Sequence, residues 1–289
     1  MTIMQSAGRH APIRKRPLLG WGVHDGLVVA RRNLIASIRV PESLFFSLVQ
    51  PVIFVLLFAY VFGGAIPIPG DGASAQDAAT AYRNYLMPGI FGQTVAFAAA
   101  ASTVGLAEDM RKGIVDRFRA LPMSHGAVLF GRTFADAARQ VLVLAVLSIT
   151  GLIVGWRITG GLLDALAAYA LLLLFAYTVA WIGSTVGLSM PNPETASTAG
   201  LIWLFPLTFL SNAFVPISSM PDWLQAFAAF NPISTLVLST RELFGNPIGI
   251  QPDYWPMQHP EVYTVMSCAV LIAIFATLAI RKFKHTTSR

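Results

Sequence analysis

The chain has 289 residues, of which 55% are hydrophobic and only 12% are charged, and its mean hydropathy is +0.63. A soluble domain carries about 25% charged residues, so the charged side chains here are too few to cover a water-facing surface. The formal net charge of +6 does not indicate a nucleic acid partner, because the basic residues stand at the ends of apolar runs. We therefore expect an integral membrane protein.

The N-terminal part of the chain is basic and only intermittently apolar. Residues 1–19 form a basic tail without the apolar core of a signal peptide, so we expect this tail to stay in the cytoplasm. In residues 20–40 the charged side chains gather on one side of a helical projection and apolar ones on a neighbouring side, which predicts an amphipathic helix on the inner membrane surface. Arg31 and Arg32 on this helix could contact lipid headgroups or a partner protein.

Six later stretches are apolar enough to cross a bilayer as helices of about 20 residues. They cover residues 44–63, 85–106, 134–155, 165–188, 198–214 and 263–280. Gly183 and Gly187, one turn apart, would let a neighbouring helix approach closely, although glycine is common in membrane helices anyway. The stretch 223–238 is also partly apolar, but Asn231-Pro232 divides it into pieces too short to span.

The lysines and arginines orient these spans. Seven precede the first span, five lie in residues 107–133 and four in the C-terminal tail, and Arg139 stands near the same end of the third span. Only Arg83, Arg157 and Arg241 fall on the other side. With six spans, both termini are expected in the cytoplasm of a multi-pass protein of the inner or plasma membrane.

Ionisable residues are missing from the central part of every predicted span, since Asp136 and Arg139 stand near one end of the third. Ion-coupled carriers place such residues at depth, and an intramembrane hydrolase needs a nucleophile with a base there. All five histidines lie outside the spans, and the single cysteine, Cys268, has no metal-ligand spacing around it. We therefore expect no catalytic residues and no metal site.

The chain also lacks a phosphate-binding loop of the form G-x-x-x-x-G-K-[ST]. It is not expected to be an enzyme or to bind a cofactor itself. If it moves a substrate uphill, the energy must come from another chain.

The most specific stretch lies between the second and third predicted spans. An acidic-basic cluster at residues 108–112 leads into Gly113, and the following residues place apolar side chains on one side of a short helix and charged ones on the other, until Pro122 ends it. The residues of this segment that we expect to couple to a partner are Gly113, Ile114, Asp116, Arg117, Phe118, Arg119, Leu121 and Pro122. A helix of this kind can dock into a cleft of a soluble partner.

These residues resemble the permease subunits of ABC transporters, in particular the daunorubicin-resistance type of multidrug exporter permease. Members carry a similar acidic-basic-Gly cluster followed by an Arg-Phe/Leu-Arg-x-Leu-Pro run. A second similarity lies after the fifth span, in Phe-Val-Pro, Met-Pro-x-Trp-Leu and Asn-Pro elements that include Pro216, Met220, Pro221, Trp223, Asn231 and Pro232. Ile114 stands where many relatives outside the drug-exporter type have threonine, which favours the drug-exporter type.

The resemblance implies an all-α membrane domain over residues 41–285. It implies six transmembrane helices, an elbow helix at residues 20–40, a coupling helix in the loop at 107–133, and a re-entrant hairpin at 221–240 on the outer side before the last span. It also implies that two permeases pair, as a homodimer or a heterodimer. Each would rest on a separate ATPase subunit that binds ATP and Mg, and the substrate would pass between the permeases.

Aromatic residues in the spans could line a path for hydrophobic drugs or lipids, although such residues more often pack or face lipid. The candidates are Phe54, Phe58, Phe97, Phe205 and Phe209. Two alternatives stay open: the same machine exporting a polysaccharide or lipid-linked glycan, and a membrane scaffold that transports nothing. The sequence does not name the substrate.

Overall fold

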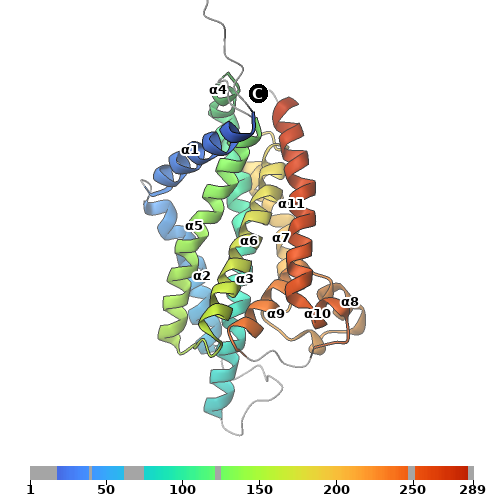
Figure 1. The fold of residues 1–289 in the computed structure, drawn as a ribbon. Coiled ribbons are helices and arrows are strands. Elements are labelled where there is room, and N and C mark those ends of the chain that lie inside the picture. The colour runs from blue at the N-terminus through green and yellow to red at the C-terminus, as the bar shows by residue number, and fades with distance from the viewer. Residues whose placement is uncertain (1–17, 39–40, 62–74, 121–124, 247–250, 286–289) are drawn as a thin grey trace, which may run out of the picture.

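The three-dimensional structure is a computed structural model that describes residues 18–38, 41–61, 75–120, 125–246 and 251–285. Every regular element in these ranges is a helix, which confirms the predicted all-α class (Figure 1). The helices are α1 (Leu18–Ile38), α2 (Pro41–Val61), α3 (Ala75–Arg111), α4 (Ile114–Ala120), α5 (His125–Val154), α6 (Leu162–Gly187), α7 (Pro193–Phe209), the 3₁₀ turn η1 (Ile217–Ser219), α8 (Asp222–Ala229), α9 (Pro232–Leu243), α10 (Trp255–Gln258) and α11 (Pro260–His285).

Among the described residues, four helices are long and apolar enough to cross a membrane. These are α3, α5, α6 and α11, which correspond to the predicted second, third, fourth and sixth spans. The predicted first and fifth spans correspond to α2 and α7. α2 has 21 residues, of which Ser47–Val61 form its apolar part as far as side chains are described, and α7 has 17 residues, slightly fewer than the usual span of about 20. A total of six spans therefore stays a prediction.

Several helices extend beyond the apolar runs, which corrects their predicted bounds. α3 begins at Ala75 instead of residue 85, because the Ala-rich residues 75–81 favour a helix although they are not apolar enough to mark a span. α5 begins at His125 instead of residue 134. Most of the predicted loop 107–133 is consequently helical.

α7 lies about five residues earlier in the chain than predicted. Its start is fixed by Asn192, whose side chain accepts a hydrogen bond of 2.8 Å from the backbone N–H of Thr195, and by Pro193 at the first helical position. Its last turn contains Pro206 and ends at Phe209. This Asn-Pro start signal is readable in the sequence but falls outside the apolar run.

α3 is the central helix and packs against α2, α5, α6, α7 and α9. Gly183 and Gly187 on α6 permit the closest of these approaches. A Cβ atom on either glycine would lie 2.3 Å from the carbonyl oxygen of Ala99 or 2.5 Å from that of Thr103, respectively. The two helices thus meet backbone to backbone, as small residues at this spacing allow.

The bundle has two distinct ends (Figure 1). One carries α4 and the last turns of α11, and we call it the α4 end; the other carries α8, α9 and α10, and we call it the α8 end. α1 crosses α5 at the α4 end, where Gly26 and Gly131 meet. The buried side of α1 carries Val29 and Ala30, whereas Leu27 is exposed. The predicted apolar side of this helix is therefore divided between packing on α5 and exposure.

At the α8 end, a seam joins the turn after α5 to the end of α9. The carbonyl oxygen of Phe244 accepts hydrogen bonds of 3.0 Å from the backbone N–H groups of both Thr159 and Gly160. The indole N–H of Trp156 donates to the side-chain oxygen of Asn246 over 2.7 Å. Gly245 has φ +70°, and a Cβ atom there would lie 2.6 Å from the backbone nitrogen of Gly160. Segments about 90 residues apart are thus in backbone contact.

Candidate functional site

Six phenylalanine rings form a continuous series across α2, α3, α7 and the turn after α7. Successive centroids are 5.0 to 6.0 Å apart, within the range for attractive ring contacts. In order, the rings belong to Phe97, Phe205, Phe209, Phe214, Phe58 and Phe54. We call this series the aromatic arch.

Five of the six arch residues are those that the sequence singled out, and the structure brings them together. The sixth, Phe214, is nearly buried and joins Phe209 to Phe58 with centroid distances of 5.8 and 5.0 Å. It is the last residue of the predicted fifth span, but α7 ends at Phe209, so Phe214 lies in the turn that follows and was not among the chosen path residues. Phe205 and Phe209 expose 46% and 52% of their surface, so the arch is accessible from outside the chain.

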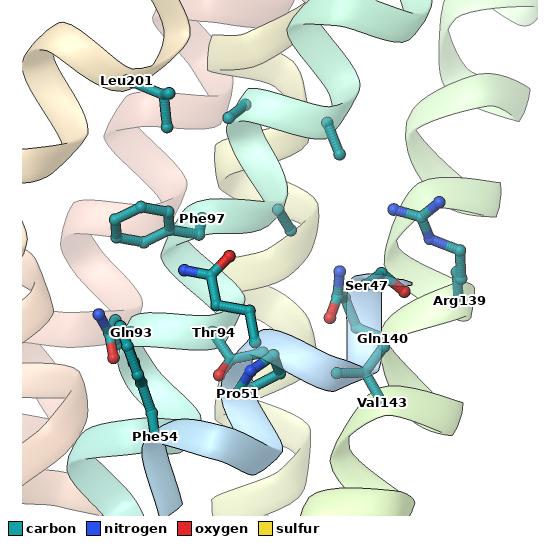
Figure 2. Close-up of a pocket in the computed structure, with 14 residues that line it drawn as sticks. Ser47, Pro51, Phe54, Gln93, Thr94, Phe97, Arg139, Gln140, Val143 and Leu201 are labelled. Atoms are coloured by element: carbon teal, nitrogen blue, oxygen red, sulfur yellow. The ribbon is translucent and has the colours of Figure 1, made fainter. Parts of the chain in front are cut away.

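A cavity of about 240 Å³ lies beside the arch, between α2, α3 and α5 (Figure 2). Phe54 and Phe97 supply its aromatic wall. Its polar lining residues include Gln93 and Thr94 on α3 and Arg139 and Gln140 on α5, beside apolar ones such as Val143 (Figure 2). The cavity therefore combines ring surfaces with hydrogen-bonding groups, as small-molecule sites do.

Arg139 lies further from the start of its helix than the predicted span suggested. Because α5 starts at His125, Arg139 lies at the middle of this 30-residue helix and not near its end. The helix is about 45 Å long, and Arg139 lies about 21 Å from its start. Any 30 Å layer of hydrocarbon that α5 crosses therefore contains this residue.

A second cavity of about 360 Å³ lies between α3, α6, α7, α9 and α11, and its walls are apolar. Phe175, Trp203 and Phe275 contribute aromatic surface to it. This space could receive an acyl chain or a ring system, but it offers little to orient either.

The segment after α7 folds as two short helices that return to the bundle. Asn231 joins them: its side-chain oxygen accepts from the backbone N–H of Ile233 over 2.9 Å, and its amide donates to the carbonyl oxygen of Leu207 over 2.6 Å. Pro232 occupies the first position of α9, where a missing N–H costs nothing. The predicted break at these residues is thus a helix cap that also holds the end of α7.

The other predicted residues of this hairpin lie at its bends. Pro216 precedes η1, Met220 follows it, and Pro221 precedes α8. Trp223 on α8 is 76% exposed. An exposed tryptophan at one end of an apolar bundle is typical of a membrane interface.

Arg241 on α9 is fully buried, although the sequence suggested only an arginine of the outer loop. Its guanidinium donates to the carbonyl oxygen of Tyr85 over 2.9 Å, to that of Asn212 over 2.7 Å and to that of Ala213 over 3.2 Å. It also lies 3.5 Å from the centroid of the Tyr85 ring, as a cation–π contact. Arg241 thus ties α9 to α3 and to the turn after α7.

Glu242, the next residue, lies at the same end with only part of its surface covered. Partial burial, and to a lesser degree the negative charge of Glu261, raise the pKa of its carboxyl.

At the α4 end, the predicted coupling segment forms the helix α4. Gly113 begins it with φ +67°, a left-handed conformation that suits glycine, and a Cβ atom there would meet nothing within 4 Å. Val115 is buried against the bundle, Ile114 and Asp116 are half-buried, and Arg117 is exposed. Phe118 and Arg119 belong to α4, but their side chains lie outside the described residues, as do Leu121 and Pro122.

Several charged residues close to α4 form ion pairs. Arg132 on α5 contacts Asp109 on α3 and lies 4.0 Å from Asp136, which also accepts a 2.8 Å hydrogen bond from Ser102. Arg111 lies 3.5 Å from Glu194 at the start of α7. Of the α1 residues predicted to contact lipid or a partner, Arg31 and Arg32 are both exposed at this end.

Comparison with known proteins decides the family. The family model described as ABC-2 type transporter matches residues 26–244, which is most of the chain. The chain belongs to the ABC-2 type transporter family.

Similar proteins include resistance permeases. This ABC-2 permease is 33% identical over 272 residues to the daunorubicin resistance ABC transporter permease protein DrrB1 of Streptomyces coeruleorubidus, covering 94% of this chain and 90% of that protein. It is 24% identical over 236 residues to the doxorubicin resistance permease DrrB of Mycobacterium tuberculosis, with 80% of each chain covered. It is 22% identical over 225 residues to the putative transport permease ycf38 of Cyanophora paradoxa, covering 78% of this chain and 75% of that protein.

These matches confirm the family that the motifs suggested and show a multi-pass membrane permease. The family is one of transporter subunits, and the geometry agrees with such a role, since it offers ring-lined surfaces and a cavity for binding. The two ends of the ABC-2 permease differ in structure. One carries the short helix α4, and the other carries the hairpin of α8 and α9, which Asn231 and Arg241 hold to the bundle by hydrogen bonds.

Proposed function

We propose that this chain is the transmembrane permease of an ATP-driven exporter that moves hydrophobic drugs or lipids out of the cell. Six helices would span the bilayer, with α2 and α7 as the first and fifth. The α4 end would face the cytoplasm with both termini, because the basic residues concentrate there. The location would be the inner or plasma membrane.

The observation that carries this proposal is the aromatic arch. It offers a run of ring surfaces across three helices, two of whose rings are about half exposed. Rings in this arrangement bind apolar and aromatic molecules without demanding one shape. The exposed side of α2 and α7 would face a second permease, so that the substrate passes between the two subunits.

Energy would come from a separate ATPase subunit that binds ATP and Mg. Its docking element would be α4, which projects from the bundle at the α4 end (Figure 1). Val115 anchors this helix, while Arg117 is exposed for contact. α1 would be the elbow helix, and the segment from Pro221 to Thr240 would be the re-entrant hairpin.

The test is ATP-dependent uptake of a daunorubicin-like fluorescent cation into inside-out vesicles that contain this chain and its candidate ATPase. We expect uptake with the wild-type chain and none with the variant Arg117→Ala, Phe118→Ala. Arg281→Ala is the matched control, because it removes an exposed arginine at the same end but on α11. Uptake that survives the double change would disprove coupling through α4.

The same vesicles separate the alternatives. A stable complex that hydrolyses ATP in response to lipid, but takes up no dye, would favour a lipid or a lipid-linked glycan as the cargo. An ATPase that binds without any stimulated hydrolysis or uptake would favour a scaffold.

A further inference from the structure

Arg139 has no counter-charge among the residues that the structure describes. It forms no hydrogen bond or ion pair with any residue that the structure describes, and its Nε atom is buried without a partner. Arg132, two turns earlier on α5, has both Asp109 and Asp136 beside it. Arg139 is the one charged residue among the described residues that line the cavity.

Its position along α5 makes this arrangement unusual. Arg139 lies at the middle of a 30-residue apolar helix, within the hydrocarbon thickness wherever the bilayer is placed along α5. Intramembrane arginines are rare, usually pair within the bundle or face a cavity, and mark binding or transport sites. Here the guanidinium faces a cavity and has no paired group in it (Figure 2).

The rest of the cavity supplies further hydrogen-bonding groups. Gln93 and Gln140 are each 4% exposed, and the side-chain oxygen of Gln140 has no partner. On the opposite wall, Phe54 and Phe97 present rings that belong to the aromatic arch. An apolar body against the rings and an acid group against Arg139 would satisfy both walls.

We propose that this cavity binds the anionic end of an amphipathic molecule, a carboxylate or a phosphate, with Arg139 as the specificity-determining residue. The proposal rests on the exporter function above and adds an anion-binding subsite to it. A substrate that carries a cationic group would place that group away from this wall, because no described lining residue balances the charge of Arg139. The anionic group could belong to a drug-like acid or to a lipid headgroup.

The experiment measures binding and not transport. The full-length chain is placed in nanodiscs of phosphatidylcholine, and fluorescence anisotropy follows two rhodamine dyes, one with a free carboxylate and the other its ethyl ester. We expect the acid to bind about tenfold more tightly than the ester, the effect of one charge-assisted hydrogen-bonded pair. Empty nanodiscs correct for partition into lipid.

Variants assign the preference to Arg139. Arg139→Gln should weaken binding of the acid about tenfold while changing that of the ester less than about twofold, and Arg139→Lys should keep part of the preference. Arg157→Gln, an exposed arginine at the α8 end, is the matched control and should change neither. Equal binding of both dyes to the wild-type chain, or equal loss of both in Arg139→Gln, would overturn the proposal.

A second arm identifies the source of the anion. Replacing a fifth of the phosphatidylcholine with phosphatidylglycerol should weaken binding of the acid dye to the wild-type chain if lipid headgroups occupy the site, and should leave it unchanged if the site takes drug-like acids. Both results keep the anion assignment. Because no ATP or ATPase is present, failure of the vesicle uptake assay would not affect this test.

Discussion

The two ends of the bundle hold their buried arginines in opposite ways. At the α4 end, Arg132 stands against carboxylates of Asp109 and Asp136, and its side chain is still 16% exposed. At the α8 end, Arg241 is fully buried and contacts backbone carbonyls and one ring. No carboxylate of the described residues pairs with it.

This difference shows at which end the contacts of the buried arginine require accurate placement of the backbone. Two carboxylates can follow an arginine through small movements, because their side chains are flexible and reach water. Carbonyl oxygens of Tyr85, Asn212 and Ala213 converge only when three separate segments are correctly placed. We therefore expect the α8 end to be rigid and the α4 end to tolerate displacement.

The largest effect is expected from Arg241→Met. The change leaves buried carbonyl oxygens without donors, each at about 1–3 kcal/mol, so we expect a loss of about 3 kcal/mol or more. Arg241→Lys should lose less, since it keeps the charge but reaches fewer acceptors. Thermal unfolding in detergent, followed by tryptophan fluorescence, measures both. A methionine variant as stable as the wild type would show that these carbonyls do not need the arginine.

Next comes Gly89→Ala on α3. A Cβ atom at Gly89 would lie 1.9 Å from the carbonyl oxygen of Ala213, so the turn that Arg241 holds must move. We expect a destabilisation of about 2 kcal/mol by the same unfolding assay. Gly126→Ala on α5 is the control, because its Cβ would meet only Ile280 at 3.6 Å. An alanine at Gly126 should be neutral or stabilise, by at most about 1 kcal/mol.

A smaller effect is expected at the α4 end. Arg132→Gln and Asp109→Asn should each cost about 1 kcal/mol, because both side chains retain some access to water. In the double variant the losses should not add, with a coupling of about 0.5–1 kcal/mol. Strict additivity in the unfolding cycle would mean that the pair contributes nothing.

The smallest effect concerns pH at Glu242. Its pKa is raised above the ordinary value of 4.5, so the folded chain holds this proton more tightly than the unfolded chain. Stability should then fall as the pH rises from 4.5 through the raised pKa, and the fall should disappear in Glu242→Gln. Unfolding temperatures of both proteins across pH 4 to 8 check this, and parallel curves would contradict it.

Much of this architecture could be predicted from sequence because apolar runs and motif spacing are local signals. The apolar runs predicted the helices α3, α5, α6 and α11. The short helix after Gly113 was predicted from its apolar and charged sides and from the glycine and proline that flank it. Helix ends were harder to predict from the sequence. A charged residue such as Arg132 suggests a loop unless its ion-pair partner, 23 residues earlier in the chain, is known.

The candidate site was only partly predictable for the same reason. Five arch residues could be chosen by type and depth, but Phe214 belongs to a turn whose course depends on Asn231 and Arg241. Arg241 donates a hydrogen bond to the backbone carbonyl oxygen of Tyr85, 156 residues earlier in the chain, and every residue has such an oxygen. No side-chain pattern in the sequence marks such an acceptor.

The seam between the turn after α5 and the end of α9 restricts where anything could leave the protein. Phe244 accepts from two consecutive backbone N–H groups, and Gly160 and Gly245 lie too close to admit even a methyl group between them. A drug-sized molecule cannot pass there unless that backbone pairing breaks. If the chain is the exporter permease proposed above, a substrate released at the α8 end would therefore have to leave by a route away from this seam.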